Sequence, residues 1–258
     1  GKSTVTSIIA GMQAASGGTM TYKGQSWKPE NMVEAQKAGI SMVLQEANTI
    51  PDCTVAENLL AGRFDEFSKF GFVSMKKANA EAEKMLLSFG ITNIHAKDSI
   101  NKLTFEDRKL IEIVRCVSDE TEVFVVDETT TALSLEGRQI LYKLIHELKE
   151  KGKCVIFISH DMAVIERVCH RVAVMYLGQI VELGSRRDVF ENPLHPYTKR
   201  LMSAVPIPDP SRRTMSHTLL TGEIPSPVRP ADYEPVVPPL KEVSPGHFVS
   251  EDQVANWF

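Results

Sequence analysis

Residues 123–128 join a short apolar strand to two adjacent acids, and this stretch limits the possible fold more than any other. Val123 to Val126 are apolar and mostly β-branched, with charged residues on both sides. Such a run predicts a strand buried on both faces, as in the middle of a parallel sheet. Asp127 and Glu128 follow at its carboxyl end, where open α/β sheets place their ligands. Adjacent acids there suggest magnesium binding and water activation beside a nucleotide, and the alternative is a polar turn after a core strand.

The segments after the acidic strand predict a strand–helix–strand unit. Residues 135–150 place apolar side chains at helical spacing, and Gly152 closes this helix as a C-cap. Residues 154–158 are again apolar, and Ser159-His160-Asp161 follows them. This order predicts parallel strands joined by a right-handed crossover. We expect His160 and Glu128 at the carboxyl ends of neighbouring strands.

The stretch before the acidic strand divides into a strand region and a helical region. Residues 40–44 are an apolar run that ends in Gln45, although a lone Gln at such a position is usually just a strand cap. From about 46 to 120 the apolar spacing becomes helical, with a capping-box pattern in residues 54–57. This pattern predicts a compact helical insertion between sheet strands.

The first four residues, Gly1-Lys2-Ser3-Thr4, match the second half of the phosphate-loop pattern GxxxxGK[ST]. In that pattern backbone amides cradle phosphates, the lysine reaches the β- and γ-phosphates and the hydroxyl binds Mg²⁺. Residues 5–11 read as the opening of a helix, whose dipole favours the same anion. A chance Gly-Lys-Ser helix start is the alternative. If the motif is real, its glycine-rich half and the preceding strand are missing, so we expect an N-terminally truncated chain with poor ATP affinity.

Length and proline distribution suggest one domain with an appendage. The 258 residues can bury a good core. Twelve of the 14 prolines follow residue 190. Residues 196–205 can form one helix that starts at a proline. The stretch from Pro206 to Phe258 is poorly patterned and predicts an extended appendage that packs on the domain or is partly disordered.

Charge and cysteine content exclude several classes of protein. The formal net charge is -4 with interspersed signs, which argues against a nucleic-acid partner. The apolar runs are far shorter than the roughly 20 residues that span a bilayer, so the chain is expected to be soluble by itself. The four cysteines are widely spaced without a CxxC pair, which favours reduced thiols over disulfides or a metal site.

In their order and spacing, Gly1-Lys2-Ser3-Thr4, Gln45, Asp127-Glu128 and His160 resemble the nucleotide-binding subunit of ATP-binding-cassette (ABC) transporters. The resemblance covers nearly the whole chain. It implies an α/β fold: a P-loop NTPase core sheet, a helical (signature) subdomain and an extended Pro-rich C-terminal appendage. The resemblance divides the chain into a nucleotide-binding domain at 1–190, with its helical subdomain at about 46–120, and a peptide-importer-type extension at 191–258.

The resemblance also implies ATP and Mg²⁺ as cofactors and a role for each motif. The Gly1–Thr4 amides and Lys2 would hold phosphates, and Ser3 would bind Mg²⁺. Gln45 would contact the metal and the attacking water. Asp127 would hold Mg²⁺ through water, Glu128 would polarise the water and His160 would bind the γ-phosphate. Positioning and charge neutralisation would then carry most of the phosphoryl transfer.

The signature segment, Leu103-Thr104-Phe105-Glu106-Asp107, departs from the Leu-Ser-Gly-Gly-Gln that is usual in the family. In the family this segment reaches across a head-to-tail dimer to the partner's γ-phosphate. Phe105 and Glu106 replace residues that let the backbone come close. Thr104 and Asp107 resemble a helix cap more than a phosphate sensor. The loop after the acidic strand departs as well, because Ser134 stands where the family usually has Asp. We therefore expect an asymmetric pair with a second cassette: the chain's own phosphate side is catalytic, and its signature side is weak or inactive.

The resemblance implies permease subunits as partners, indirectly a substrate-binding protein, and a peripheral place at the cytoplasmic face of the inner membrane. The transported solute stays open. Residues 1 to about 120 resemble sugar-importer (ribose-type) ATPases, for example in residues 39–46. From about 158 onward the chain resembles dipeptide, oligopeptide and especially glutathione importers, for example in residues 174–182, 192–198 and 222–227.

Two explanations account for this split. One is a mosaic chain, natural or an artefact of assembly, with a seam around 120–160; the other is a single divergent lineage. Peptide or glutathione is slightly favoured as the solute. A catalytically impaired regulatory cassette and a soluble ABC ATPase without a transport role are further alternatives. No cysteine follows Cys169, which predicts no iron–sulfur cluster, although peptide-importer relatives often have cysteines in this region.

Overall fold

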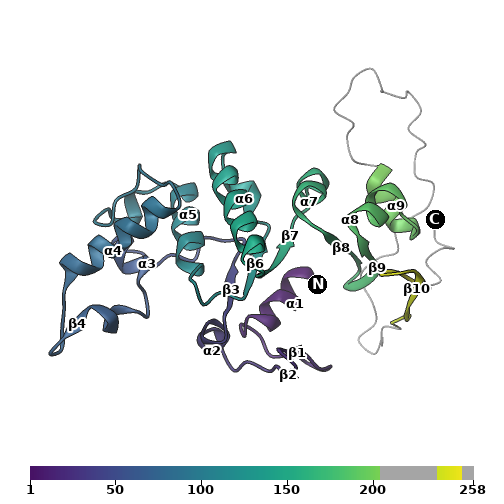
Figure 1. The fold of residues 1–258 in the computed structure, drawn as a ribbon, viewed down its shortest axis with the longest axis horizontal. Coiled ribbons are helices and arrows are strands. Elements are labelled where there is room, and N and C mark those ends of the chain that lie inside the picture. Colours follow the sequence, from purple (N-terminus) through teal and green to yellow (C-terminus); the bar gives the residue numbers. More distant parts are fainter. Residues whose placement is uncertain (204–236, 252–258) are drawn as a thin grey trace, which may run out of the picture. The chain divides into compact units, whose positions relative to one another are not determined.

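A parallel sheet forms around the acidic strand in the computed structural model of the chain (Figure 1), which describes residues 1–203 and 237–251. The chain forms two compact units. One unit comprises Ser3–Ser159, here called the core unit. The other, the C-terminal unit, comprises His160–Phe258 together with Gly1–Lys2.

The described α-helices are α1 (Lys2–Ile9), α2 (Met32–Lys37), α3 (Val55–Leu59), α4 (Met75–Ser88), α5 (Phe105–Cys116), α6 (Leu135–Glu150), α7 (Met162–Val168), α8 (Arg186–Glu191) and α9 (Pro196–Ser203). The described strands are β1 (Thr21–Tyr22), β2 (Gln25–Ser26), β3 (Ile40–Val43), β4 (Ser68–Lys69), β5 (Phe72–Val73), β6 (Val123–Asp127), β7 (Cys154–Ile158), β8 (Arg171–Tyr176), β9 (Gln179–Ser185), β10 (Leu240–Ser244) and β11 (His247–Ser250).

The sheet of the core unit has the order β3-β6-β7, and both of its pairs are parallel. The register pairs Val43 with Val126, and Val126 with Phe157. The central strand β6 is buried along almost its whole length. These findings confirm the predicted buried strand and the parallel β6–α6–β7 unit. The carboxyl ends of β3 and β6 therefore lie at the same edge of the sheet.

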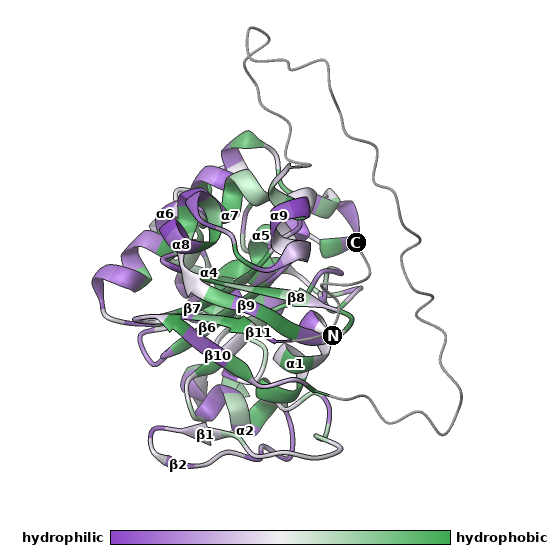
Figure 2. Cartoon of the chain, turned by 90° about the vertical axis from the view of Figure 1, so that its right-hand side faces the viewer, coloured by the Kyte–Doolittle hydropathy of each residue, from purple (hydrophilic) through white to green (hydrophobic). Residues whose placement is uncertain are grey.

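Helices and strands of the core unit bury complementary apolar surfaces. On one face of the sheet, Ala10, the residue after α1, packs with Met42 and Val125. Side chains alternate along a strand, so Phe124 and Val126 point to the opposite face. Helix α5 contacts β3, and α6 contacts β7. In Figure 2, β6 and β7 are mainly hydrophobic, whereas α6 carries both kinds of residue, as expected of a helix that is half covered.

The region from 46 to 120 is mainly helical, as the apolar spacing predicted. Thr54 forms the expected capping box with Glu57 at the start of α3. Between α3 and α4, however, residues 64–67 form a 3-10 turn, and β4 and β5 form a small hairpin. Helical periodicity cannot predict such a hairpin, because its strands have only two residues each.

The C-terminal unit is built on an antiparallel sheet with the order β10-β11-β9-β8. The β8–β9 turn consists of Leu177 and Gly178, which both have positive φ angles, 46° and 85°. A two-residue hairpin turn requires this conformation, and glycine adopts it without a steric penalty. Val172, Val174, Val181 and Val189 form the buried core of this unit.

The predicted proline-rich appendage falls mostly on residues 204–236 and 252–258, which lie outside the described part of the chain. Its described part differs from the expectation of poor patterning, because β10 and β11 form a hairpin that pairs with β9. Pro245-Gly246 occupies the hairpin turn, and Gly246 has a φ of 76°. In the described residues, no helix is long and apolar enough to cross a membrane.

Candidate nucleotide site

Asp127 is the last residue of β6, and its side chain is buried with 3% exposure. Its Oδ1 atom has no hydrogen-bond partner among the described residues. Burying an unpartnered carboxylate oxygen is unfavourable, so a bound cation or its water shell would satisfy it. Mg²⁺ prefers carboxylate, hydroxyl and water oxygens, and Asp127 therefore fits this ion.

Glu128 has a backbone conformation that is uncommon for a residue with a side chain. Its φ and ψ angles are 46° and 27°, in the left-handed region. Its amide donates a hydrogen bond to the Ile158 carbonyl, with an N–O distance of 3.0 Å. This conformation turns the chain from β6 into the 3-10 turn Thr129–Ala132. Strained backbone often accompanies functional sites, and no residue pattern around Glu128 predicted this conformation.

Gln45 lies two residues beyond the end of β3, and its side chain is exposed. Because Val43 pairs with Val126, the segment that carries Gln45 leaves the sheet at the same edge as Asp127. The structure thus brings Gln45, Asp127 and Glu128 to one edge of the sheet, as the pattern of strand ends predicted.

Ser3 and Thr4 are exposed in the first turn of α1. The Ser3 carbonyl accepts a hydrogen bond from the Thr6 hydroxyl at 3.1 Å. Gly1, Lys2 and His160 belong to the C-terminal unit. The geometry of the core unit therefore brings together Gln45, Asp127 and Glu128, and it does not join Lys2 or His160 to them.

The signature segment forms a helix cap, as its sequence predicted. The Thr104 hydroxyl accepts from the Asp107 amide at 3.1 Å, and the Asp107 carboxylate accepts from the Thr104 amide at 3.2 Å. Phe105 is 51% exposed at the start of α5. Glu106 takes no part in this cap: its Oε1 accepts from the amide and hydroxyl of Ser134, at 2.9 and 2.6 Å. Sequence reasoning missed this contact, because its partners are 28 residues apart.

Sequence reasoning also missed two charged residues that hold the loop around Gln45. Lys109 and Glu112 of α5 have relative exposures of 0% and 1%. They face inward together with the apolar residues of the helix. Their spacing of three residues could have indicated this pair, since it places Lys109 and Glu112 on one side of a helix.

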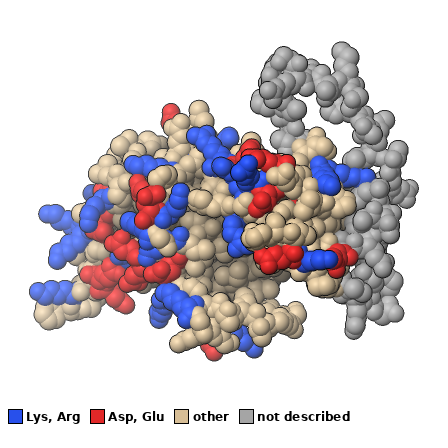
Figure 3. Space-filling view, turned by 45° about the vertical axis from the view of Figure 1, so that its right-hand side comes forward, with Lys and Arg blue, Asp and Glu red and all other residues tan. Residues whose placement is uncertain are grey.

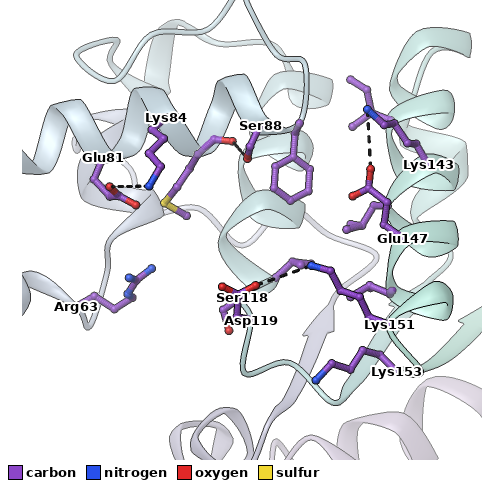
Figure 4. A pocket seen from close by; sticks show the side chains of 16 residues that line it. Arg63, Glu81, Lys84, Ser88, Ser118, Asp119, Lys143, Glu147, Lys151 and Lys153 are labelled. Atoms are coloured by element: carbon purple, nitrogen blue, oxygen red, sulfur yellow. Dashed lines mark hydrogen bonds and ion pairs between the residues drawn. The ribbon is translucent and has the colours of Figure 1, made fainter.

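A pocket with a volume of about 440 Å³ lies between α4, the loop after α5 and α6 (Figure 4). Its charged side chains form ion pairs, including Lys84 with Glu81, Lys143 with Glu147 and Lys151 with Asp119, each at 3.9 Å. None of the predicted site residues lines it. On the face shown in Figure 3, Lys and Arg side chains are interspersed with Asp and Glu.

Solved structures show what class of fold this is. A dimeric post-hydrolysis state of the ATP-binding cassette MJ0796, bound to ADP and Pi, matches 72% of the chain and 81% of its own length, with a TM-score of 0.61 and 23% identity. A nucleotide-free ATP-binding cassette from an ABC transporter matches 78% of the chain and 83% of its own length, with a TM-score of 0.64 and 22% identity. The chain thus has the α/β fold of ATP-binding cassettes.

Family models and sequence relatives agree with this fold. A model described as ABC transporter matches residues 1–131, which is half of the chain, so the chain belongs to the ABC transporter family. A second model, oligopeptide/dipeptide transporter, C-terminal region, matches residues 181–232.

Two similar relatives are glutathione import ATP-binding proteins GsiA. The protein from Pectobacterium atrosepticum is 36% identical over 99% of the chain, and that from Escherichia coli K12 is 35% identical over 98%. The chain spans 41% of the length of each. The predicted likeness to peptide and glutathione importers is confirmed, whereas none of these matches supports the likeness to sugar importers.

Proposed function

We propose that this chain is the ATP-binding and ATP-hydrolysing part of an importer for peptides or glutathione. The observation that carries the proposal is that Gln45, the buried Asp127 and the left-handed Glu128 lie at one edge of the core sheet. The chain that carries them belongs to the ABC transporter family. The oligopeptide/dipeptide match at 181–232 supports the class of solute. One relative aligns with 99% of the chain, which favours a single lineage over a mosaic.

The proposed roles follow from the chemistry of each residue. Gly1, Lys2, Ser3 and Thr4 bind the phosphates, and Ser3, Gln45 and Asp127 hold Mg²⁺, directly or through water. Bound Mg²⁺ supplies positive charge against the phosphate oxygens. Glu128 orients and polarises the attacking water, Gln45 contacts it, and His160 binds the terminal phosphate. The chain thereby positions reactants and neutralises charge, which are the main contributions in phosphoryl transfer.

The proposed assembly is a head-to-tail pair of cassettes attached to permease subunits at the cytoplasmic face of the membrane, supplied by a substrate-binding protein. Residues 1–190 form the cassette, and 191–258 form its importer-type extension. We assign the chain's signature segment a weak role in the pair, because Thr104 and Asp107 cap their own helix and Glu106 bonds to Ser134.

This last observation favours a second candidate function, a regulatory cassette that binds ATP without hydrolysing it. The two functions are distinguished by ATP binding and turnover of the chain in its complete protein, with and without a partner cassette. The importer function predicts turnover that Glu128→Gln abolishes while ATP binding persists. A cassette that binds ATP and shows no turnover in any pairing supports the regulatory function instead. Glutathione and short peptides, tested for uptake with ribose as the control, identify the solute.

A further inference from the structure

Two buried charges on α5 hold the backbone on both sides of Gln45. The Lys109 ammonium forms an ion pair with Glu112 Oε2 at 2.8 Å, inside the core unit. The same ammonium donates to the carbonyl of Leu44 at 2.6 Å and to that of Glu46 at 2.8 Å. An ammonium has three N–H groups, so these three acceptors satisfy it completely.

The partner acid extends the contact along the loop. Glu112 Oε1 accepts from the Leu44 amide at 3.3 Å, and Oε2 accepts from the Asn48 amide at 3.4 Å. Arg115, one turn further along α5, donates to the Asn48 carbonyl at 2.8 Å. Residues 44–48 are therefore attached to α5 through five backbone groups of three residues.

Gln45 lies between two residues that these contacts hold, and it is exposed, as are Glu46 and Asn48. The neighbours on either side of it are fixed through their carbonyl groups, whereas its side chain extends to the surface at the sheet edge that carries Asp127. The loop has no ladder partner at this point, because β3 ends at Val43. The position of Gln45 thus depends on α5 rather than on the sheet.

A buried ion pair is a poor source of stability, because its desolvation cost is comparable with its attraction. Apolar residues of similar size often replace such a pair without loss of stability, but they could not hold two carbonyls and two amides of a loop. Since apolar packing would serve the core unit equally well, what the pair specifically provides is a fixed loop.

We propose that Lys109 and Glu112 are positioning residues for Gln45, and that they keep its side chain at the sheet edge beside Asp127. This inference rests on the proposed ATPase function, in which Gln45 contacts the metal and the water. The same contacts link the loop that carries Gln45 to α5, the helix that starts at the signature segment.

The test replaces the pair as a unit with Lys109→Met/Glu112→Leu, which removes both charges and keeps an inward apolar face. Hydrogen exchange of the backbone amides in residues 44–48 should become at least 10-fold faster, while exchange in β6 stays unchanged. In the complete protein, kcat for ATP should fall at least 10-fold with KM changed less than 3-fold. The control Lys143→Met/Glu147→Leu removes an exposed pair of α6 and should change neither quantity.

A second experiment separates positioning from general damage. In a Gln45→Ala background, the double substitution at 109 and 112 should lower kcat by less than 2-fold, because the residue that it positions is already absent. Independent, multiplicative losses of kcat would overturn the proposal. Unchanged exchange in residues 44–48 would also overturn it.

Failure of the proposed function gives a different result from failure of this inference. If the unaltered protein shows no ATP turnover, the ATPase assignment is wrong, while the exchange measurement still decides whether the pair fixes the loop. If turnover is normal and the loop stays protected in Lys109→Met/Glu112→Leu, the inference alone is wrong.

Discussion

The Glu106 carboxylate receives two hydrogen bonds from Ser134, from the hydroxyl at 2.6 Å and from the backbone amide at 2.9 Å. Ser134 in turn caps α6, since its hydroxyl oxygen accepts from the Gly137 amide at 3.2 Å. The carboxylate also lies close to Gly137, where an added Cβ would be 2.5 Å from Glu106 Oε1 and would displace it. The two departures from the family pattern, at 106 and 134, are therefore one feature that joins the signature segment to the loop after the acidic strand.

Glu106→Ala should lower the free energy of unfolding by about 1–2 kcal/mol, because the Ser134 hydroxyl and amide lose a charged acceptor. Urea unfolding of the variant and the parent chain measures the difference. Glu150→Ala, at the opposite end of α6, is the matched control and should change stability by less than about 0.5 kcal/mol. Equal stability of the Glu106 variant and the parent chain would show that water replaces the contact at no cost.

Ser134→Asp should be harmful only while Glu106 is present. Asp caps helices about as well as Ser, so the substitution preserves the start of α6. It also replaces a hydroxyl donor by a second carboxylate next to Glu106, and two like charges at hydrogen-bond distance repel each other. A double-mutant cycle with Glu106→Gly should give a coupling of about 1–2 kcal/mol. Additive effects of the two substitutions would contradict the idea that they form one feature.

Asp127→Asn should separate stability from function. The buried Oδ1 has no hydrogen-bond partner within the described part of the chain, so loss of the charge should leave the melting temperature of the ligand-free chain unchanged or raise it. Binding of Mg²⁺ in the presence of ATP should weaken by at least about 10-fold, since an amide is a weaker ligand than a carboxylate for this ion. Calorimetry and thermal melting, each with and without Mg²⁺, measure the two effects. A large destabilisation with intact Mg²⁺ binding would make Asp127 a structural residue.

Cys116 should make the stability of the chain fall in alkaline solution. Burial raises the pKa of this thiol from 9.0 to about 12. The folded chain therefore keeps a proton that the unfolded chain loses, and the contribution to stability is complete below pH 9 and declines above it. The expected slope is about -1.4 kcal/mol per pH unit up to pH 12. Urea unfolding at pH 8, 9, 10 and 11 should show this slope in the difference between the parent chain and Cys116→Ala. A difference that stays constant with pH would contradict the buried neutral thiol.

Sequence reasoning succeeded where a feature depends on local periodicity. The apolar runs located β6, β7 and α6 within one residue, and the Thr104 and Asp107 spacing predicted a capping box that the structure contains. It failed where a contact joins residues distant in the chain, as with Lys109 and Leu44, which are 65 positions apart. The β10–β11 hairpin was missed for another reason, because the surrounding prolines concealed the turn at Pro245-Gly246.

Glu182 should contribute strongly to the stability of the C-terminal unit. Its carboxylate is fully buried and accepts from the amides of Leu194 and His195, each at 3.0 Å. Its Oε1 also lies 2.8 Å from Nε2 of His247, on the strand that pairs with β9. Glu182→Ala leaves these groups without an acceptor, so the free energy of unfolding should fall by about 3 kcal/mol or more.

The loss of stability in Glu182→Ala should be greatest in the β10–β11 hairpin. Hydrogen exchange in residues 247–250 of Glu182→Ala should become faster than in β8, because β11 loses its buried contact to β9. Glu242→Ala is the matched control: Glu242 is an exposed acid that accepts a hydrogen bond from the Gly246 amide at 2.8 Å. It should cost no more than about 0.5 kcal/mol. If both variants unfold at the same urea concentration, the buried carboxylate does not hold the hairpin, and the β9–β11 backbone pairing alone must account for its position.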